Sequence, residues 1–264
     1  MNSRICLVFC GFLLLHFSQA FVPCCQTRSS RSLVLGVMTS VQDPYETFTP
    51  FERLLFRRFA DSVSAELNDG SPSAADYKEL MASINRMANS RPLTQVNQQG
   101  KSMLVRLFPS WLLPLYKVLI QGPLPRFSAV MNCFVTKWTT NWLMGPSKVY
   151  DIDERLPDGS VGVVAPSSGL LIEKCRFLES TGCVKTCLHA CKVPTQSFFM
   201  EEMGLPVTLS PNMTDLSCRF HFGVVPKDLK DDPINFSPCL DICAKSKLRT
   251  KTNSSPCVLY SNLC

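Results

Sequence analysis

Seven cysteines lie within the 69 positions from Cys175 to Cys243 of this 264-residue chain, out of ten that follow residue 42. Ordinary use of cysteine as a small core residue would scatter them along the sequence. Thiols that are brought together form disulfides in an oxidising compartment, whereas in a reducing compartment they bind metal or do redox chemistry. The compartment therefore decides which of these structures the chain can adopt.

The first 42 residues have the composition of a two-part targeting leader. Residues 1–20 combine Arg4, an apolar run and the small-x-small ending Ser18-Gln19-Ala20, as in a secretory signal peptide. Residues 21–42 contain arginine and serine but no acidic residue, as in an organelle transit peptide. Phe21, directly after the expected cleavage site, resembles the leaders of algae with complex plastids. We therefore expect a plastid location, and simple secretion is the alternative.

The charge balance excludes one large class of partner. Beyond residue 42 the chain has 24 basic and 21 acidic residues, a net charge of +3. Nucleic-acid-binding domains carry a strong and clustered positive charge. We therefore expect no nucleic-acid partner.

Residues 45–145 are predicted to be helical. The segment Thr49-Pro50-Phe51-Glu52 has an N-cap threonine, a proline at the first helical position and a glutamate three residues after the cap. Further helices are expected from Ser71-Pro72 to before Pro92, and over about 127–144, where Gly145-Pro146 ends the pattern.

The most apolar segment of the mature chain, Met103 to Gln121, has two interpretations. Pro109 and Pro114 interrupt it and Arg106 and Lys117 add charge, so it is not a clean transmembrane helix. The first interpretation is a buried helix pair. The second is an amphipathic element in a membrane surface, with Trp111 and Tyr116 at the level of the lipid headgroups.

Residues 150–247 form a cysteine-rich region, and residues 248–264 form a tail. The region begins with a turn at 156–159 and a strand at 161–164, and a helix is expected from about Leu170. Two further strands are expected at 205–209 and 218–222. The whole predicts an α+β fold, with amino-terminal helices followed by short strands packed on helices.

The cysteine spacing favours metal binding. Cys183, Cys187 and Cys191 are four residues apart, and residues i and i+4 on a helix have Cβ atoms about 5–6 Å apart. All three cannot bind one ion on a straight helix, because Cys183 and Cys191 would be about 12 Å apart along its axis. Either a cluster of several iron atoms spans them or the helix breaks. Soft, anionic thiolates suit iron, iron-sulfur clusters and zinc.

Several alternatives stay open from the residues alone. The cysteines can be buried thiols without metal, the ligands of a non-catalytic iron-sulfur or zinc protein, or the disulfides of a secreted binding module. A two-histidine, one-carboxylate iron site would need both histidines beyond the leader and one acid, which gives the set His189, His221, Glu201, Glu202 and Asp215. A serine hydrolase has no support, since the pattern G-x-S-x-G is absent from the sequence.

An ordered series of short motifs over roughly residues 126–247 resembles the plant plastid β-carotene isomerase family that begins strigolactone synthesis. The motifs are Trp142 to Pro146, Leu156 to Gly159, Glu173 to Phe199, Gly204-Leu205-Pro206, Pro211-Asn212, Asp215 to Cys218, and Pro238-Cys239 with Cys243. The amino-terminal helices resemble the family only loosely. Plant members carry a plain transit peptide, so the two-part leader departs from them.

The resemblance implies an iron-dependent enzyme that interconverts all-trans- and 9-cis-β-carotene, with the iron either mononuclear or in an iron-sulfur cluster. Its partners would be a carotenoid substrate and, peripherally, a plastid membrane. His189 and His221 are not part of the family motifs. The metal-binding residues that the resemblance carries over are Cys175, Cys183, Cys187, Cys191, Cys218, Cys239 and Cys243, with Pro194-Thr195-Gln196 beside them.

Overall fold

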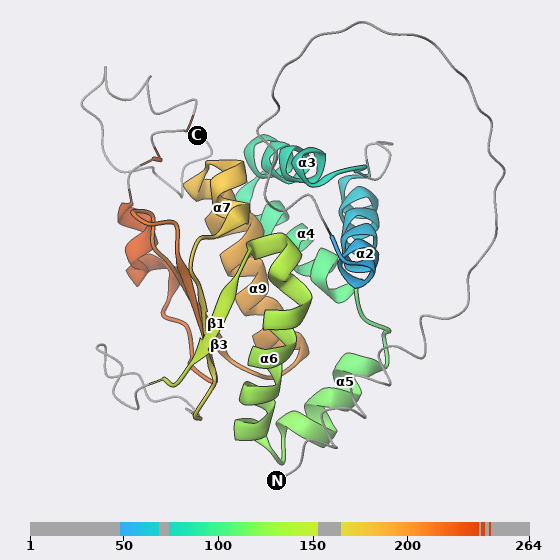
Figure 1. Ribbon diagram of the computed structural model, residues 1–264, viewed down its shortest axis with the longest axis vertical. Coiled ribbons are helices and arrows are strands. Elements are labelled where there is room, and N and C mark those ends of the chain that lie inside the picture. Colours follow the sequence, from blue (N-terminus) through green and yellow to red (C-terminus); the bar gives the residue numbers. More distant parts are fainter. Residues whose placement is uncertain (1–47, 69–73, 153–164, 238, 241–242, 244–264) are drawn as a thin grey trace, which may run out of the picture. The chain divides into compact units, whose positions relative to one another are not determined.

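The computed structural model describes residues 48–68, 74–152, 165–237, 239–240 and 243 (Figure 1). From Phe48 onwards the chain forms one compact unit. The leader, the turn and strand expected at 156–164, and the tail at 248–264 lie outside the described residues.

A group of helices makes up the first part of this unit. They are α2 (Pro50–Leu67), α3 (Tyr77–Ser90), α4 (Leu93–Val105), α5 (Leu112–Tyr116), which continues as the π-helix η1 (Lys117–Gln121), and α6 (Pro125–Met144). The predicted capping box of α2 is confirmed: Thr49 Oγ1 accepts from the Glu52 amide, and Glu52 Oε2 accepts from the Thr49 amide. The helix predicted at 127–144 is confirmed as α6.

The second part holds a four-stranded antiparallel sheet in the order β1-β2-β4-β3. Its strands are β1 (Ser147–Tyr150), β2 (Gly169–Ile172), β3 (Val207–Pro211) and β4 (Cys218–Phe222). The central pair aligns Ile172 with Cys218 and Leu170 with Phe220. Alternation along β4 turns Cys218, Phe220 and Phe222 into the core, while Arg219 is exposed. The α+β fold is therefore confirmed.

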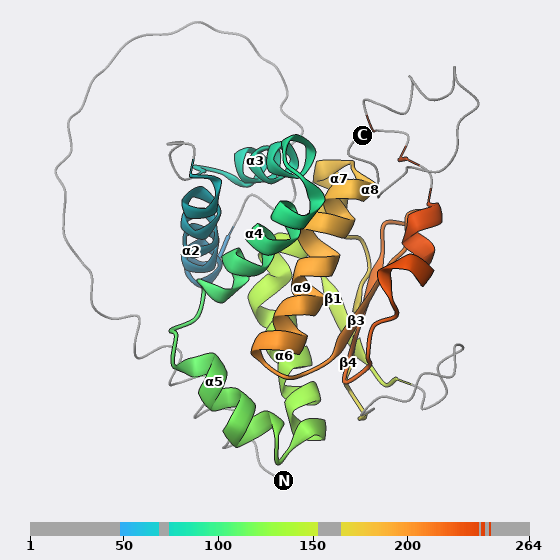
Figure 2. The same ribbon diagram turned by 180° about the vertical axis from the view of Figure 1, so that it is seen from behind.

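The connection from β2 to β3 is a nearly continuous helical segment against one face of the sheet. It consists of α7 (Arg176–Thr181), α8 (Val184–Thr186), η2 (Cys187–Lys192), α9 (Val193–Ser197) and η3 (Phe198–Glu202), of which η2 and η3 are π-helical. Figure 2 shows α9 between α4 and the sheet. Two short 3-10 turns follow the sheet, η4 (Leu229–Asp231) and η5 (Pro233–Phe236).

Some sequence predictions are wrong in detail. The helix expected from Leu170 is instead strand β2, because Gly169 to Ile172 pairs with strands on both sides. Short apolar runs do not distinguish a buried strand from a helix. The second helix begins at Tyr77 rather than Ser71-Pro72, since the Asp76 carboxylate caps it by accepting from the Glu79 amide. Helix α4 was not predicted: it begins at Leu93 and includes the first residues of the apolar segment that starts at Met103.

The apolar segment is only partly buried, so the expectation of a buried helix pair is wrong for one side of it. Leu113 and Tyr116 are buried, and the Tyr116 hydroxyl hydrogen-bonds to Ser128 and Asn132 of α6. Trp111 and Val118 are 47% and 71% exposed. In the part of the chain that is described, no helix is long and apolar enough to cross a membrane.

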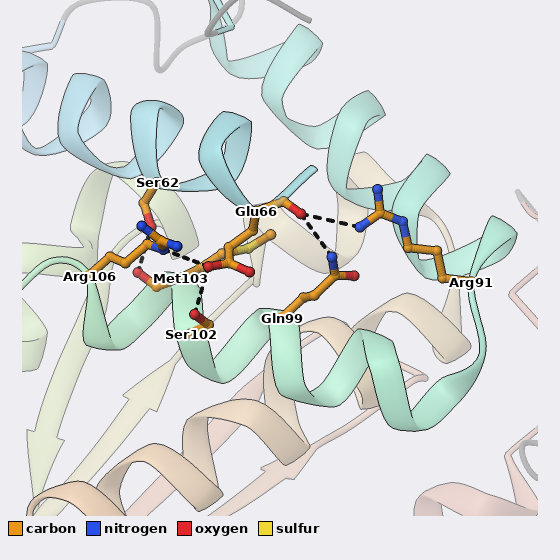
Figure 3. A network of polar contacts seen from close by, with 7 residues as sticks. All are labelled: Ser62, Glu66, Arg91, Gln99, Ser102, Met103 and Arg106. Carbon is orange, nitrogen blue, oxygen red and sulfur yellow. Dashed lines mark hydrogen bonds and ion pairs between the residues drawn. The ribbon is translucent and has the colours of Figure 1, made fainter. Parts of the chain in front are cut away.

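A polar network holds the end of α2 against α4 (Figure 3). The Glu66 carboxylate accepts from Ser102 Oγ at 2.6 Å and pairs with Arg106 Nε at 2.5 Å. The backbone carbonyl of Glu66 accepts from Gln99 Nε2 and Arg91. The last carbonyls of a helix have no partner within the helix. Side chains of α4 and its preceding turn supply these partners, and so fix the angle between the two helices.

The first and second parts are in close contact where Gly100 of α4 meets Pro194 of α9. A β-carbon at residue 100 would lie 2.6 Å from Pro194 Cγ and 2.9 Å from its Cβ. Distances below 3 Å force one of the helices to move. Only glycine therefore permits this contact, which holds α4 against the helical segment that carries Cys187 and Cys191.

We expect Gly100→Ala to destabilise the protein by about 1–3 kcal/mol, the usual cost of overpacking a close contact. The sign of the change in the free energy of unfolding is informative, because without this contact alanine would stabilise a helix by up to about 1 kcal/mol relative to glycine. Urea unfolding measures the difference. In a Pro194→Ala background the atom of closest approach is gone, so the same substitution should cost less. An equal cost in both backgrounds would contradict the contact.

Candidate metal centre

Four of the seven candidate cysteines line one small cavity between the sheet and the helices. Cys175 precedes α7, Cys187 and Cys191 lie in η2, and Cys218 begins β4. The cavity volume is about 10 Å³, close to the minimum for one water molecule. The remaining lining is mainly apolar: Met144, Ile172, Phe177, Leu178, Leu209, Pro211 and Phe220, with Lys192. The fold thus brings thiols from three distant segments to one place.

Each thiol reaches the cavity for a local reason. Strand alternation directs Cys218 inwards with Phe220. The i, i+4 spacing in η2 puts Cys187 and Cys191 on one side of the helical segment. Cys175 lies just before α7, where its backbone amide donates to the Leu216 carbonyl at 2.7 Å. This bond ties the start of α7 to the turn before β4, and so holds Cys175 close to Cys218.

Burial makes the four thiols poor acids. It raises the pKa of Cys191 to about 12, raises that of Cys175, and raises those of Cys187 and Cys218 well above the ordinary value. The neighbouring thiols add to this effect, because a charge on one disfavours a charge on the next. In the absence of a cation, burial therefore favours the neutral thiol form of all four side chains at neutral pH.

Lys192 is a charged residue of the cavity that sequence reasoning missed. Its buried ammonium pairs with the Asp232 carboxylate, and its positive charge acts to lower the pKa values of Cys187 and Cys218. The signal available in the sequence was only its position next to Cys191. The residues Pro194-Thr195-Gln196 have visible roles: the Thr195 side chain hydrogen-bonds to Cys191, and Gln196 Oε1 accepts from the Leu209 amide of β3.

The other three candidate cysteines are not part of the cavity lining. Cys183 is the N-cap of α8, where extended backbone interrupts the helical segment, as in the second of the two possibilities that the spacing left open. Cys239 packs against the small cluster of Val184, Leu188 and Ile234. Cys243 is half-buried. The helix break explains why Cys183 does not continue the line of Cys187 and Cys191.

The histidines belong to different surroundings. His189 is buried against α4, where its Nδ1 lies 3.1 Å from Asn97 Oδ1, and His221 of β4 packs edge-on to the Tyr150 ring. Glu201 and Glu202 both pair with Lys101, and the Asp215 carboxylate accepts from the Ser217 amide. The five residues of the possible two-histidine site are therefore not assembled.

The cavity is not a ready-made site for a single ion. Among the described residues, no group of three or more His, Cys, Asp or Glu side chains is arranged to hold one metal ion. The four cavity cysteines also form no disulfide with one another. The arrangement is that of four neutral thiols around a common apolar space.

Comparison with known proteins identifies the family. A profile described as beta-carotene isomerase D27-like, C-terminal, matches residues 142–231. The chain is 32% identical over 203 residues to the chloroplastic beta-carotene isomerase D27 of Medicago truncatula, covering 75% of this chain and 74% of that protein. This chain belongs to the beta-carotene isomerase D27-like family. The Arabidopsis thaliana protein of the same name is 32% identical over 177 residues, covering 67% of this chain and 64% of its own length. No solved structure matches the chain.

The D27-like match confirms the resemblance seen in the motifs and includes the whole cavity. Cys175, Cys187, Cys191 and Cys218 all lie within residues 142–231, as does Cys183. Cys239 and Cys243 lie beyond the matched segment. The part of the chain that carries the family profile is thus the part that builds the thiol cavity.

The metal-free protein should lose stability as the pH rises above about 8.5, the ordinary pKa of a cysteine thiol. A thiol whose pKa is raised in the folded protein keeps its proton there, while the unfolded chain releases it. The stabilisation that comes from this thiol is therefore complete at pH values below its pKa in the unfolded chain, and it decreases as the pH rises above that value. Each such thiol adds a slope of up to about 1.4 kcal/mol per pH unit. Urea unfolding of Cys187→Ala between pH 8 and about 10 should show a shallower decline than the wild type.

Leu178→Ala is the matched control, since Leu178 lines the same cavity without carrying a proton. It should lower stability at every pH and leave the slope unchanged. A Cys187→Ala protein that declines as steeply as the wild type would show that this thiol is not held neutral by burial.

Proposed function

We propose that this chain is an iron-dependent carotenoid cis/trans isomerase of a plastid, which interconverts all-trans- and 9-cis-β-carotene. The observation that carries the proposal is the four-thiol cavity inside the segment that matches the beta-carotene isomerase profile. Both aligned relatives are named as beta-carotene isomerases and as chloroplastic proteins. Their names support the substrate class and the location.

The donor set fits iron. Thiolates bind iron readily, alone or in iron-sulfur clusters. Cys175, Cys187, Cys191 and Cys218 surround one space but are not drawn in around a single ion. These four residues would hold the iron either as a single ion or in an iron-sulfur cluster. Binding would replace the thiol protons, so iron affinity should rise with pH.

The other residues of the cavity lining would give a bound iron centre an apolar surrounding. The apolar side chains of the lining exclude water, and Lys192, paired with Asp232, offsets part of the negative charge that thiolates bring. A bound iron centre would supply reversible one-electron exchange, which lowers the order of a polyene double bond without net redox change. β-Carotene has no polar group, so its affinity must come from buried apolar surface, worth about 25 cal/mol per Å².

A non-catalytic iron-sulfur or zinc protein is the second candidate. The observation in its favour is the cavity volume of about 10 Å³, which leaves no room for a carotene beside the thiols. Such a protein would use the same four cysteines for metal storage or electron transfer. The two candidates make the same prediction for metal content and different predictions for carotene.

The test is anaerobic expression with iron supplied, followed by metal analysis and chromatography of all-trans-β-carotene after incubation with the protein. Bound iron together with new 9-cis-β-carotene is the expected result. A different cis product would keep the enzyme class and change the bond that is turned. Bound metal without any new isomer would favour the non-catalytic candidate, and the absence of metal would overturn both.

We expect Cys218→Ala to lose most of its bound iron and to lower the isomerase activity at least about tenfold, because substitutions at a metal site commonly weaken metal affinity or activity by that factor or more. Cys133→Ala is the matched control. Cys133 is also buried, but its thiol donates to the Gly169 carbonyl and lies outside the cavity lining. Iron content and activity should stay near wild type in this variant. Equal iron loss in both variants would mean that the four-thiol cavity is not the metal site.

A further inference from the structure

One helical hairpin carries most of the exposed large apolar side chains among the described residues. Eight of the twelve such side chains among the described residues belong to the segment from Trp111 to Trp138. We call them the hairpin face: Trp111, Leu115, Val118 and Leu119 on α5 and η1, with Leu124, Phe127, Phe134 and Trp138 on or just before α6. Contiguous exposed apolar surface usually marks an interaction site.

The hairpin face is continuous across the two helices. Figure 1 shows α5 and η1 descending to a tight turn from which α6 rises. The Tyr116 hydroxyl contacts Ser128 and Asn132, which fixes the sides on which the helices meet. On each helix the exposed residues recur at helical spacing and lie to one side of this contact. Because the helices run in opposite directions, the two apolar stripes face the same way.

The charged side chains of the hairpin segment itself are all basic. From Leu80 to Tyr150 the sequence has no aspartate or glutamate. It has eight basic residues there, namely Arg86, Arg91, Lys101, Arg106, Lys117, Arg126, Lys137 and Lys148. Arg106, Lys101 and Lys148 pair with carboxylates from other parts of the chain. Within the described part of the chain, Lys117, Arg126 and Lys137 of the hairpin form no ion pair, and the Lys117 ammonium donates to the backbone carbonyl of Glu201 at 3.1 Å.

We propose that the hairpin face docks on a bilayer that contains anionic lipid. An exposed apolar surface with two tryptophans and basic residues beside it has the composition of an interfacial membrane-binding element. Each basic residue near an anionic surface adds attraction of about 1 kcal/mol. The membrane contact rests on the hairpin alone and does not depend on the proposed isomerase activity.

A second copy of the chain fits this face less well. A symmetric dimer would place the same patch on both partners, and so bring Lys117, Arg126 and Lys137 of each copy towards their counterparts. No carboxylate lies between Leu80 and Tyr150 to receive them. Like charges across an interface are unfavourable. An anionic lipid surface removes this repulsion and buries the same apolar side chains.

The structure corrects the anchor residues that the sequence suggested for a membrane contact. Tyr116 is only 4% exposed and its hydroxyl is used within the protein, so it does not lie at the headgroups. Trp138 is 64% exposed and takes that role with Trp111. The docking surface therefore includes α6, which sequence reasoning had treated as an ordinary helix.

Tryptophan fluorescence of the full chain gives a direct readout. The chain has three tryptophans, of which Trp142 is buried, so a spectral change on adding vesicles reports Trp111 and Trp138. Vesicles of phosphatidylcholine with phosphatidylglycerol should shift the emission to the blue, and brominated lipids should quench it. Phosphatidylcholine alone should act more weakly, and high salt should weaken the anionic case. Residues 1–47 are present in every sample, so differences between variants belong to the hairpin.

Val118→Asp should weaken vesicle binding at least about tenfold, since an apolar side chain that docking would bury in the bilayer is replaced by a negative charge. Val118 is 71% exposed, so the variant should fold. Val225→Asp changes another exposed valine, in the segment after β4, and should bind within about twofold of the wild type. Arg126→Glu is a second test, which should weaken binding to anionic vesicles and leave binding to phosphatidylcholine unchanged.

Three outcomes would overturn the proposal. The first is an unchanged spectrum with anionic vesicles. The second is equal weakening by Val118→Asp and Val225→Asp, which would make the effect nonspecific. The third is a blue shift that appears without vesicles as protein concentration rises and that Val118→Asp abolishes, which would assign the hairpin face to a second copy of the chain.

Discussion

The burial of four thiols in one apolar space is the constraint on which the cysteine-rich half of this protein depends. Cys175, Cys187, Cys191 and Cys218 come from a loop, a π-helical segment and a strand, so their meeting requires the sheet and the helical connection to be in register. Low polarity keeps them neutral as thiols and would strengthen their hold on a cation as thiolates. Packing and metal affinity therefore have the same structural cause.

The sequence predicted the local structure better than the long-range contacts. The capping box at Thr49, the helix that ends at Met144 and the strand from Cys218 to Phe222 follow from neighbouring residues alone, and all are present. Leu170 was predicted to be helical because three apolar residues in a row do not reveal that two other strands flank them. Cys183 was grouped with Cys187 by spacing, while the break in the helix depends on packing around it.

Predictions about the candidate site have the same limit. Composition singled out seven cysteines, but nothing in the sequence indicated which four would share a cavity. The cavity needs Cys218 opposite Cys187 and Cys175, and these contacts join residues 31 to 43 positions apart. Lys192 and its partner Asp232 are likewise 40 residues apart. Such pairings arise from the sheet register and the path of the helical connection, which no local pattern encodes.

The π-helical geometry of η2 limits how this part of the chain can vary in length. A π-helical turn holds about one residue more than an α-helical turn. Each residue of an α-helix rotates the chain by about 100° around the helix axis. Removing a residue between Cys187 and Cys191 would restore ordinary helix and rotate one thiol away from the other. It would also shift Pro194 from its contact with Gly100. Insertions and deletions should thus be far less tolerated between Cys187 and Pro194 than substitutions of individual side chains.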